Sequence, residues 1–272
     1  MEIVRKTQKG IYLRRHPKFG TLIFSPFSGL FLAVADNFSG DVERYCNNKT
    51  HDLPEKIINH LNIGNEKYKC ASFDVENWLP SKEHFSDIDE LPDGQPIVLN
   101  WLISNRCNCN CTYCYAGDVI DKEFAEVDEI KIAKELLDMN PLAIVLSGGE
   151  PLLEKNKLKN VLNTIGNKTG IMLDTNGLIY QQDIVPLLKK YNVVVRISLD
   201  SLLNSVNSKI RPQKDKKDNE LGVQTIVKNI LSYREVGIPV LVHTVLSTMN
   251  KKHIEDLSIQ LPLLNVNGWR IF

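Results

Sequence analysis

Four cysteines lie within eight consecutive residues of this chain: Cys107, Cys109, Cys111 and Cys114. Thiolates packed this densely have two chemical interpretations. All four could bind one zinc ion, although their spacing departs from the usual paired-knuckle arrangement. Alternatively, Cys107, Cys111 and Cys114 hold three irons of a [4Fe–4S] cluster and leave the fourth iron open to another ligand. Both interpretations make this segment the chemical centre of the protein.

The rest of the composition is that of an ordinary globular protein. The 272 residues carry 33 Lys and Arg against 33 Asp and Glu, and 43% of them are apolar. A neutral chain lacks the basic excess of a protein that binds bulk nucleic acid or anionic membranes. The first residues have no apolar signal segment, and no apolar run approaches the ~20 residues that span a bilayer. We therefore expect a cytoplasmic protein with reduced thiols, which favours a metal or cluster over disulfides.

The second part of the chain supplies the elements that must position these cysteines. Short, largely apolar runs alternate with amphipathic helical patterns, which predicts βαβ units and a parallel sheet, either open or curled into a barrel. The predicted strands are Ile97–Ile103, Ala143–Leu146, Gly170–Asp174, Val193–Leu199, Val240–Leu246 and Trp269–Phe272. The predicted helices are Val127–Met139, Glu154–Ile165, Gln182–Tyr191, Val223–Val236 and His253–Leu261. The cysteines directly follow the first strand, at the end where α/β folds place their chemistry.

The first 80 residues predict a separate small α+β domain. Its expected strands are Ile11–Arg15, Thr21–Phe24 and Gly29–Ala35, followed by helices at Asp41–Cys46 and Pro54–Leu61. Residues 81–96 are charged and rich in proline, which indicates a linker. The main domain then occupies residues 97–272.

The cysteine segment resembles the radical SAM superfamily. Cys107-Asn108 and Cys114-Tyr115, with Tyr113 before the last cysteine, match the family variant "CN..C.YCY". The resemblance covers residues 97–272 and implies a partial (βα)6 barrel, preceded here by a winged-helix-like α+β domain. It makes Cys107, Cys111 and Cys114 the ligands of a [4Fe–4S] cluster and leaves Cys109 as a bystander.

Further motifs follow the next strands in the family's order. Gly148-Gly149-Glu150 is similar to the loop that receives the amino group of S-adenosylmethionine (SAM): the glycines permit close approach, and the carboxylate can accept from an ammonium. The other residues that the resemblance assigns to SAM are Tyr113, Asn176, Ser198, Asp200, Arg211 and Leu246. Among them, Ser198 corresponds to a ribose contact, Arg211 to a carboxylate contact and Leu246 to the adenine-packing strand end.

The resemblance also implies a reaction. A one-electron donor such as flavodoxin or ferredoxin would reduce the cluster, SAM would be cleaved, and the 5′-deoxyadenosyl radical would remove hydrogen from the substrate. The small N-terminal domain and the segment 20–30 are similar to those of enzymes that mature ribosomally made peptides. An edge strand there could bind a leader-like peptide segment by strand addition.

Two alternatives to a peptide substrate stay open. The first is radical SAM chemistry on a small molecule, as in cofactor or nucleobase biosynthesis. The second is a non-catalytic zinc or Fe–S protein. Peptide maturases usually continue into a cysteine-rich extension with auxiliary clusters, so a chain ending at Phe272, on the sixth predicted strand, is expected to be a fragment or an unusually short member. No catalytic residue is identified, and His243 is expected to be a satisfied core histidine rather than a catalytic one.

Overall fold

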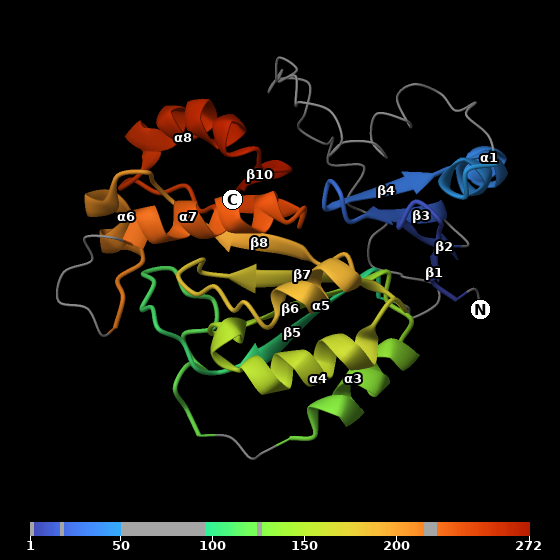
Figure 1. The fold of residues 1–272 in the computed structure, drawn as a ribbon, viewed down its shortest axis with the longest axis horizontal. Helices are drawn as coiled ribbons and strands as arrows, with labels where there is room; N and C mark the ends of the chain where they lie inside the picture. The colour runs from blue at the N-terminus through green and yellow to red at the C-terminus, as the bar shows by residue number, and fades with distance from the viewer. Residues whose placement is uncertain (1–2, 17–18, 50–95, 124–126, 215–221) are drawn as a thin grey trace, which may run out of the picture.

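The computed structural model describes residues 3–16, 19–49, 96–123, 127–214 and 222–272. Within them the chain forms an antiparallel sheet of order β1-β2-β3-β4 and a parallel sheet of order β10-β9-β8-β7-β6-β5 (Figure 1). The antiparallel strands are β1 Arg5–Lys6, β2 Tyr12–His16, β3 Gly20–Ser25 and β4 Leu30–Val34. The parallel strands are β5 Val98–Ser104, β6 Ala143–Gly148, β7 Gly170–Thr175, β8 Val194–Ser198, β9 Val240–Thr244 and β10 Gly268–Ile271. The predicted fold class, a partial α/β barrel after a small N-terminal sheet, is confirmed.

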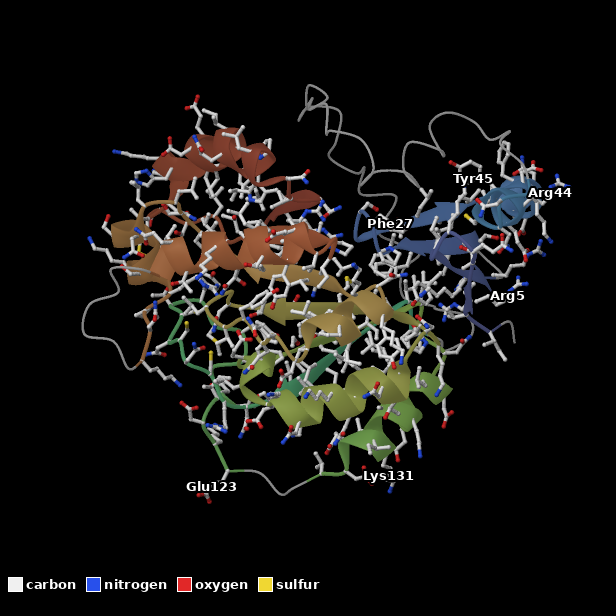
Figure 2. The ribbon with its side chains drawn as sticks, in the orientation of Figure 1. Arg5, Phe27, Arg44, Tyr45, Glu123 and Lys131 are labelled. Atoms are coloured by element: carbon white, nitrogen blue, oxygen red, sulfur yellow. The ribbon has the colours of Figure 1, made fainter. Side chains whose placement is uncertain are left out.

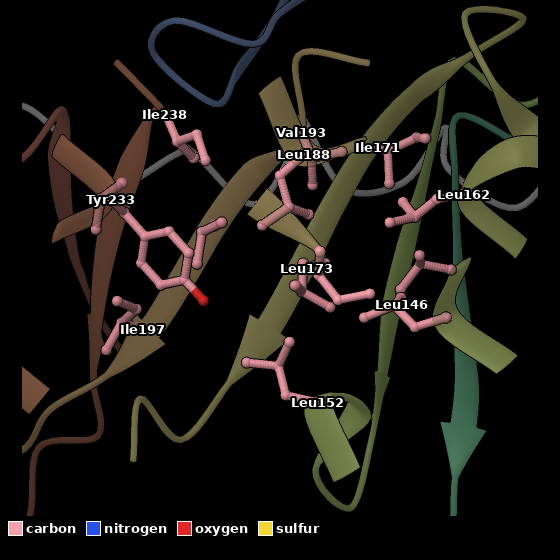
Figure 3. Packing of buried hydrophobic residues seen from close by; sticks show 14 of the residues in the cluster. Leu146, Leu152, Leu162, Ile171, Leu173, Leu188, Val193, Ile197, Tyr233 and Ile238 are labelled. Atoms are coloured by element: carbon pink, nitrogen blue, oxygen red, sulfur yellow. The ribbon is translucent and has the colours of Figure 1, made fainter. Parts of the chain in front are cut away.

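Helices cover the outer face of the parallel sheet. They are α3 Glu129–Asp138, α4 Lys155–Ile165, α5 Val185–Lys190, α6 Asn204–Ile210, α7 Gly222–Glu235 and α8 Ile254–Gln260, with short 3-10 turns η3 Pro151–Leu153, η4 Lys251–His253 and η5 Leu261–Leu264. Leu146, Leu173 and Ile197 point from the strands toward Leu162 and Tyr233 of the helices, and all are buried in one cluster (Figure 3). Because side chains alternate along a strand, the residues between them face the inner, concave side.

The N-terminal sheet packs on that inner face, at the ends where the parallel strands begin. Tyr12, Leu22 and Phe24 share a buried cluster with Val145 and Met172 and their neighbours, and β7 points away from this sheet in Figure 1. The opposite face of the sheet packs against α1 (Asp36–Cys46). Figure 2 shows Phe27, in the β3–β4 turn, on the side toward the parallel sheet, whereas Arg44 and Tyr45 lie on α1. The N-terminal sheet is therefore a layer of the main core.

The close packing of the two sheets depends on small residues. A Cβ at Gly170 would overlap the ring of Phe24, and a Cβ at Gly29 would overlap the Leu241 side chain. Glycine at these positions lets β3 and its turn approach the barrel strands, so the two sheets share one continuous core.

Several predicted boundaries were wrong for physical reasons. The fifth barrel strand ends at Thr244 rather than Leu246, because the Val245 amide donates to the Asp200 carboxylate instead of a strand. The third predicted helix starts at Val185 rather than Gln182, with a proline in its first turn, where proline is tolerated. The sequence patterns did not predict α6.

The predicted helix Pro54–Leu61 and residues 81–95 of the predicted linker lie outside the described residues. No helix in the described part of the chain combines the length and the apolar character that crossing a membrane requires.

Candidate active site

The cysteine loop follows β5 and is fixed first by the end of β6. The Gly149 amide donates to the Ser104 carbonyl at 2.7 Å, and the Glu150 amide donates to the Arg106 carbonyl at 2.7 Å. A Cβ on Gly149 would overlap the Arg106 carbonyl oxygen, so only glycine allows this approach. The start of the loop is thereby held against the β6 turn.

The other side of the loop pairs with the segment that follows α6. The Asn110 amide donates to the Pro212 carbonyl at 2.8 Å, and the Thr112 amide donates to the Ile210 carbonyl at 2.9 Å. These bonds bring residues nearly 100 positions apart into contact, and they place the nearby Arg211 beside the cysteines.

The four thiols of the loop differ in environment. Cys109 is buried, Cys107 and Cys111 are partly buried, and Cys114 is exposed. Hydrogen bonding to Cys109 lowers the pKa of Cys107 to about 6 and that of Cys111 to about 7, and it raises the pKa of Cys109. Within the described residues, no group of three or more His, Cys, Asp or Glu side chains is arranged so that it could hold a metal ion. Two acidified thiols and an exposed third on one loop nevertheless form a donor set that fits an iron–sulfur cluster.

A cavity of 530 Å³ opens at the carboxyl ends of the parallel strands, between the cysteine loop and the inner face of the sheet. Eight of the predicted site residues line it: Tyr113, Cys111, Cys114, Gly148, Gly149, Asn176, Ser198 and Arg211. Cys107, Glu150, Asp200 and Leu246 do not line it. The structure thus gathers most of the predicted residues around one hollow and separates four of them from it.

The Glu150 carboxylate does not line the cavity, where the resemblance leads us to expect it opposite the amino group of SAM. It is fully buried and accepts hydrogen bonds from Leu152 N (3.1 Å), Thr175 Oγ1 (2.9 Å) and Asn176 N (2.7 Å). Burial outweighs these bonds and raises its pKa to about 7. Glu150 therefore joins the end of β6 to the turn after β7, and the Gly148–Gly149 pair is what faces the cavity.

Leu246 is also placed differently from the expectation. Half of its surface is exposed, and its neighbour Val245 lines the cavity instead. The reason is the alternation that continues past β9: His243 and Val245 share the inner side, so Leu246 points outward.

Asp200 lies behind the residues that line the cavity. It is fully buried, accepts a hydrogen bond from the Tyr113 hydroxyl, and lies 3.8 Å from Nη1 of Arg211. Arg211 in turn donates to the Tyr113 hydroxyl at 2.6 Å. This triad ties the cysteine loop to the end of β8, so Asp200 orients two residues that do line the cavity.

Two arginines, an aspartate and a histidine of the cavity were not among the predicted site residues. Asp174, Arg196, His243 and Arg270 lie one or two residues before the ends of β7, β8, β9 and β10 and line the cavity. Charged residues at alternate positions in otherwise apolar strands were the signal that could have revealed them. His243 also differs from the satisfied core histidine expected, because its Nε2 is buried with no hydrogen-bond partner.

Comparison with known proteins places this arrangement in a family. Residues 101–258 match the family model described as the radical SAM superfamily. The S-adenosylmethionine-dependent nucleotide dehydratase of Psychrobacter lutiphocae is 30% identical over 66% of this chain and 65% of its own length. The sporulation killing factor maturation protein SkfB of Bacillus subtilis is 28% identical over 60% of this chain and 38% of its own length.

A solved structure has a similar fold. SuiB of Streptococcus suis, bound to its precursor peptide SuiA, superimposes with a TM-score of 0.60 at 14% identity, covering 100% of this chain and 63% of SuiB. That likeness concerns the fold alone. The chain spans less than two thirds of the length of each of these three proteins.

Proposed function

The chain belongs to the radical SAM superfamily, and on that premise we propose that it abstracts hydrogen from a peptide substrate. The family implies a [4Fe–4S] cluster and SAM, which together supply a 5′-deoxyadenosyl radical by one-electron cleavage of SAM. The observation that carries the proposal is the C-x3-C-x2-C loop at the mouth of a cavity in a partial barrel.

Cys107, Cys111 and Cys114 are the proposed cluster ligands. The lowered pKa of Cys107 and Cys111 favours the thiolate, which is the form that binds iron. Cys109 is buried, and its raised pKa keeps it protonated. Its amide also donates to the Cys107 sulfur at 3.4 Å, so its proposed role is to support the loop rather than to bind iron.

SAM is proposed to lie across the cavity. The Gly148–Gly149 pair gives its amino group close access to the protein backbone, and Asn176 and Ser198 supply polar side chains from the ends of β7 and β8. Arg211, with a side chain only 9% exposed, is proposed to bind its carboxylate. Tyr113 and Asp200 keep that guanidinium in place.

Two observations support a peptide as the substrate. The N-terminal sheet ends at β4, whose neighbour in the sheet is β3 alone, so one edge of β4 is without a strand among the described residues. A peptide can add to such an edge. In addition, a maturation protein and a precursor-peptide complex are among the proteins similar to this chain.

A small-molecule substrate is the second candidate. It is favoured by the similarity to the nucleotide dehydratase, whose name specifies a nucleotide rather than a peptide. Both candidates need an external one-electron donor, for which flavodoxin or ferredoxin is proposed.

Anaerobic reconstitution tests the proposal. Protein reconstituted with iron and sulfide, then reduced with dithionite in the presence of SAM, is expected to form 5′-deoxyadenosine and methionine. Two results would contradict the proposal: the protein binds zinc instead of iron, or it binds iron but forms no 5′-deoxyadenosine. Binding of leader-like peptides to the chain then separates the peptide candidate from the small-molecule one.

A further inference from the structure

Three arginines line the cavity, and two of them have an internal carboxylate partner. Arg196 donates to both carboxylate oxygens of Asp174, with its Nη2 at 2.6 Å. Arg211 lies beside the buried Asp200. The charges of these two guanidiniums are therefore balanced within the fold.

The third, Arg270 on β10, is not balanced in this way. Its Nη2 donates to the carbonyl of Gly29 at 2.6 Å, and within the described residues no carboxylate lies within ion-pair distance of it. The charge of Asp174 acts on Arg270 from farther away, but both oxygens of that carboxylate are already bonded to Arg196, so two guanidiniums share one negative charge. Arg270 lines the cavity and is partly buried. A guanidinium partly removed from water without a carboxylate of its own is unfavourable, and an anion entering the cavity relieves that cost.

The residue beside Arg270 carries no charge of its own. His243 pairs with Arg270 in the β9–β10 register. Burial, with the charges of Arg196 and Arg270, lowers the pKa of His243 to about 3, so the imidazole is neutral. Its ring lies edge-on to Phe272, with 5.1 Å between the ring centroids. This corner of the cavity thus offers an unbalanced cation, a neutral imidazole and an aromatic wall.

The position of Arg270 assigns the anion to the substrate rather than to SAM. The proposed partner of the SAM carboxylate is Arg211, which is joined to the cysteine loop through Tyr113. Arg270 is joined instead to Gly29 in the turn of the N-terminal sheet. The two guanidiniums therefore serve different parts of the cavity.

We propose that Arg270, flanked by His243 and Phe272, is the subsite for a carboxylate of the peptide substrate. The inference rests on the proposed function and adds a substrate feature to it, namely an acidic side chain or chain end near the reacting residue.

The test compares two blocked tripeptides, acetyl-Ala-Glu-Ala-amide and acetyl-Ala-Gln-Ala-amide, which differ by one charge. Their dissociation constants are measured by calorimetry on the reconstituted protein with saturating SAM. The proteins are the wild type, Arg270→Gln, Arg270→Lys and the control Arg44→Gln, which removes an exposed arginine on α1 (Figure 2).

We expect the wild type to bind the Glu peptide at least about tenfold more tightly than the Gln peptide, as a charge-assisted hydrogen bond should give. Arg270→Gln should lose that preference while binding the Gln peptide as before, which shows that the variant is folded. Arg270→Lys should keep part of the preference, and Arg44→Gln all of it.

Equal binding of the two peptides by the wild type, or a preference that survives in Arg270→Gln, would overturn the subsite. Stronger competition by inorganic phosphate than by the Glu peptide would overturn its assignment to a carboxylate. Absence of 5′-deoxyadenosine from the wild type would instead contradict the proposed function. The comparison of the two peptides would still report whether Arg270 binds a carboxylate.

Discussion

At the scale of single residues, the cysteine loop combines a donor set with its own support. The buried Cys109 is hydrogen-bonded to Cys107 and Cys111, and this lowers the pKa of both. A residue outside the family pattern is therefore in contact with two residues inside it. The spacing predicted Cys107, Cys111 and Cys114 as ligands, and the structure places Cys109 in contact with two of them.

Alanine at each cysteine tests this division. We expect Cys107→Ala, Cys111→Ala and Cys114→Ala to lose iron and to reduce 5′-deoxyadenosine formation to background. Each of the three cysteines is proposed to bind one iron of the cluster, so each variant lacks a ligand. Cys109→Ala should retain the cluster. Iron and sulfide content with the ultraviolet–visible spectrum checks both, and loss of the cluster in Cys109→Ala would make it a ligand.

Glu150 predicts a pH dependence of stability. Its pKa in the folded protein, about 7, lies above the ordinary 4.5, so folding favours the protonated form. Its contribution is fully present below pH 4.5 and is lost as the pH rises to about 7, a change of about 3 kcal/mol. The glutamine of Glu150→Gln does not titrate. The free energy of unfolding of the variant, relative to that of the wild type, should therefore rise as the pH increases across that range. Urea unfolding of the cluster-free proteins at several pH values checks this, and parallel pH curves would refute it.

At the scale of elements, the end of β6 determines where the cysteine loop begins. Gly148 has a φ of 128°, and a Cβ there would overlap the backbone of Ser104. Gly149 makes the same kind of approach to Arg106. Two backbone segments thus meet without side chains between them, and the position of the loop depends on that contact.

Gly149→Ala should therefore displace the cysteine loop. The new methyl group meets a carbonyl that cannot rotate away, so we expect an overpacking cost of about 1–3 kcal/mol and a lower iron content after reconstitution. Gly40→Ala, on α1 with nothing within 4 Å of the added Cβ, is the matched control. Iron per chain and the melting temperature are the measurements, and equal iron content in both variants would count against this account.

At the scale of the whole molecule, the N-terminal sheet closes the end of the barrel opposite the cavity. Phe24 of β3 packs into a cluster with residues from four barrel strands. Arg270 also contacts this sheet, through the carbonyl of Gly29, from the wall of the cavity. The two sheets should therefore unfold together.

A double-mutant cycle tests whether the two sheets are energetically coupled. Gly170→Ala should cost about 1–3 kcal/mol because its methyl group meets the Phe24 ring, and Phe24→Ala should cost about 3–5 kcal/mol. The double variant should be destabilised by less than the sum, by about 1 kcal/mol or more, because the smaller side chain makes room for the methyl group. Strict additivity in denaturant unfolding would mean that the sheets are not coupled at this point.

Patterns within short stretches of sequence predicted the cysteine motif and most of the strands and helices. The C-x3-C-x2-C spacing lies within eight residues, and strand and helix periods repeat over short windows, so neither needed distant contacts to be recognised. The alternation of strands with helices predicted a parallel sheet, open or closed, and the resemblance to the radical SAM superfamily predicted the partial barrel. Boundaries failed where a distant residue intervened, as Asp200 does when it captures the amide of Val245.

The sequence by itself determined the cluster motif, the α/β class and the order of the turns that surround the cavity, because each is written in consecutive residues. The tertiary structure decided the rest. It buried the Glu150 carboxylate, joined Tyr113 to Asp200 and paired Arg196 with Asp174, leaving Arg270 without a carboxylate of its own. The physical reason is that charge balance and burial depend on distances between residues far apart in the chain, and those distances exist only once the strands lie side by side.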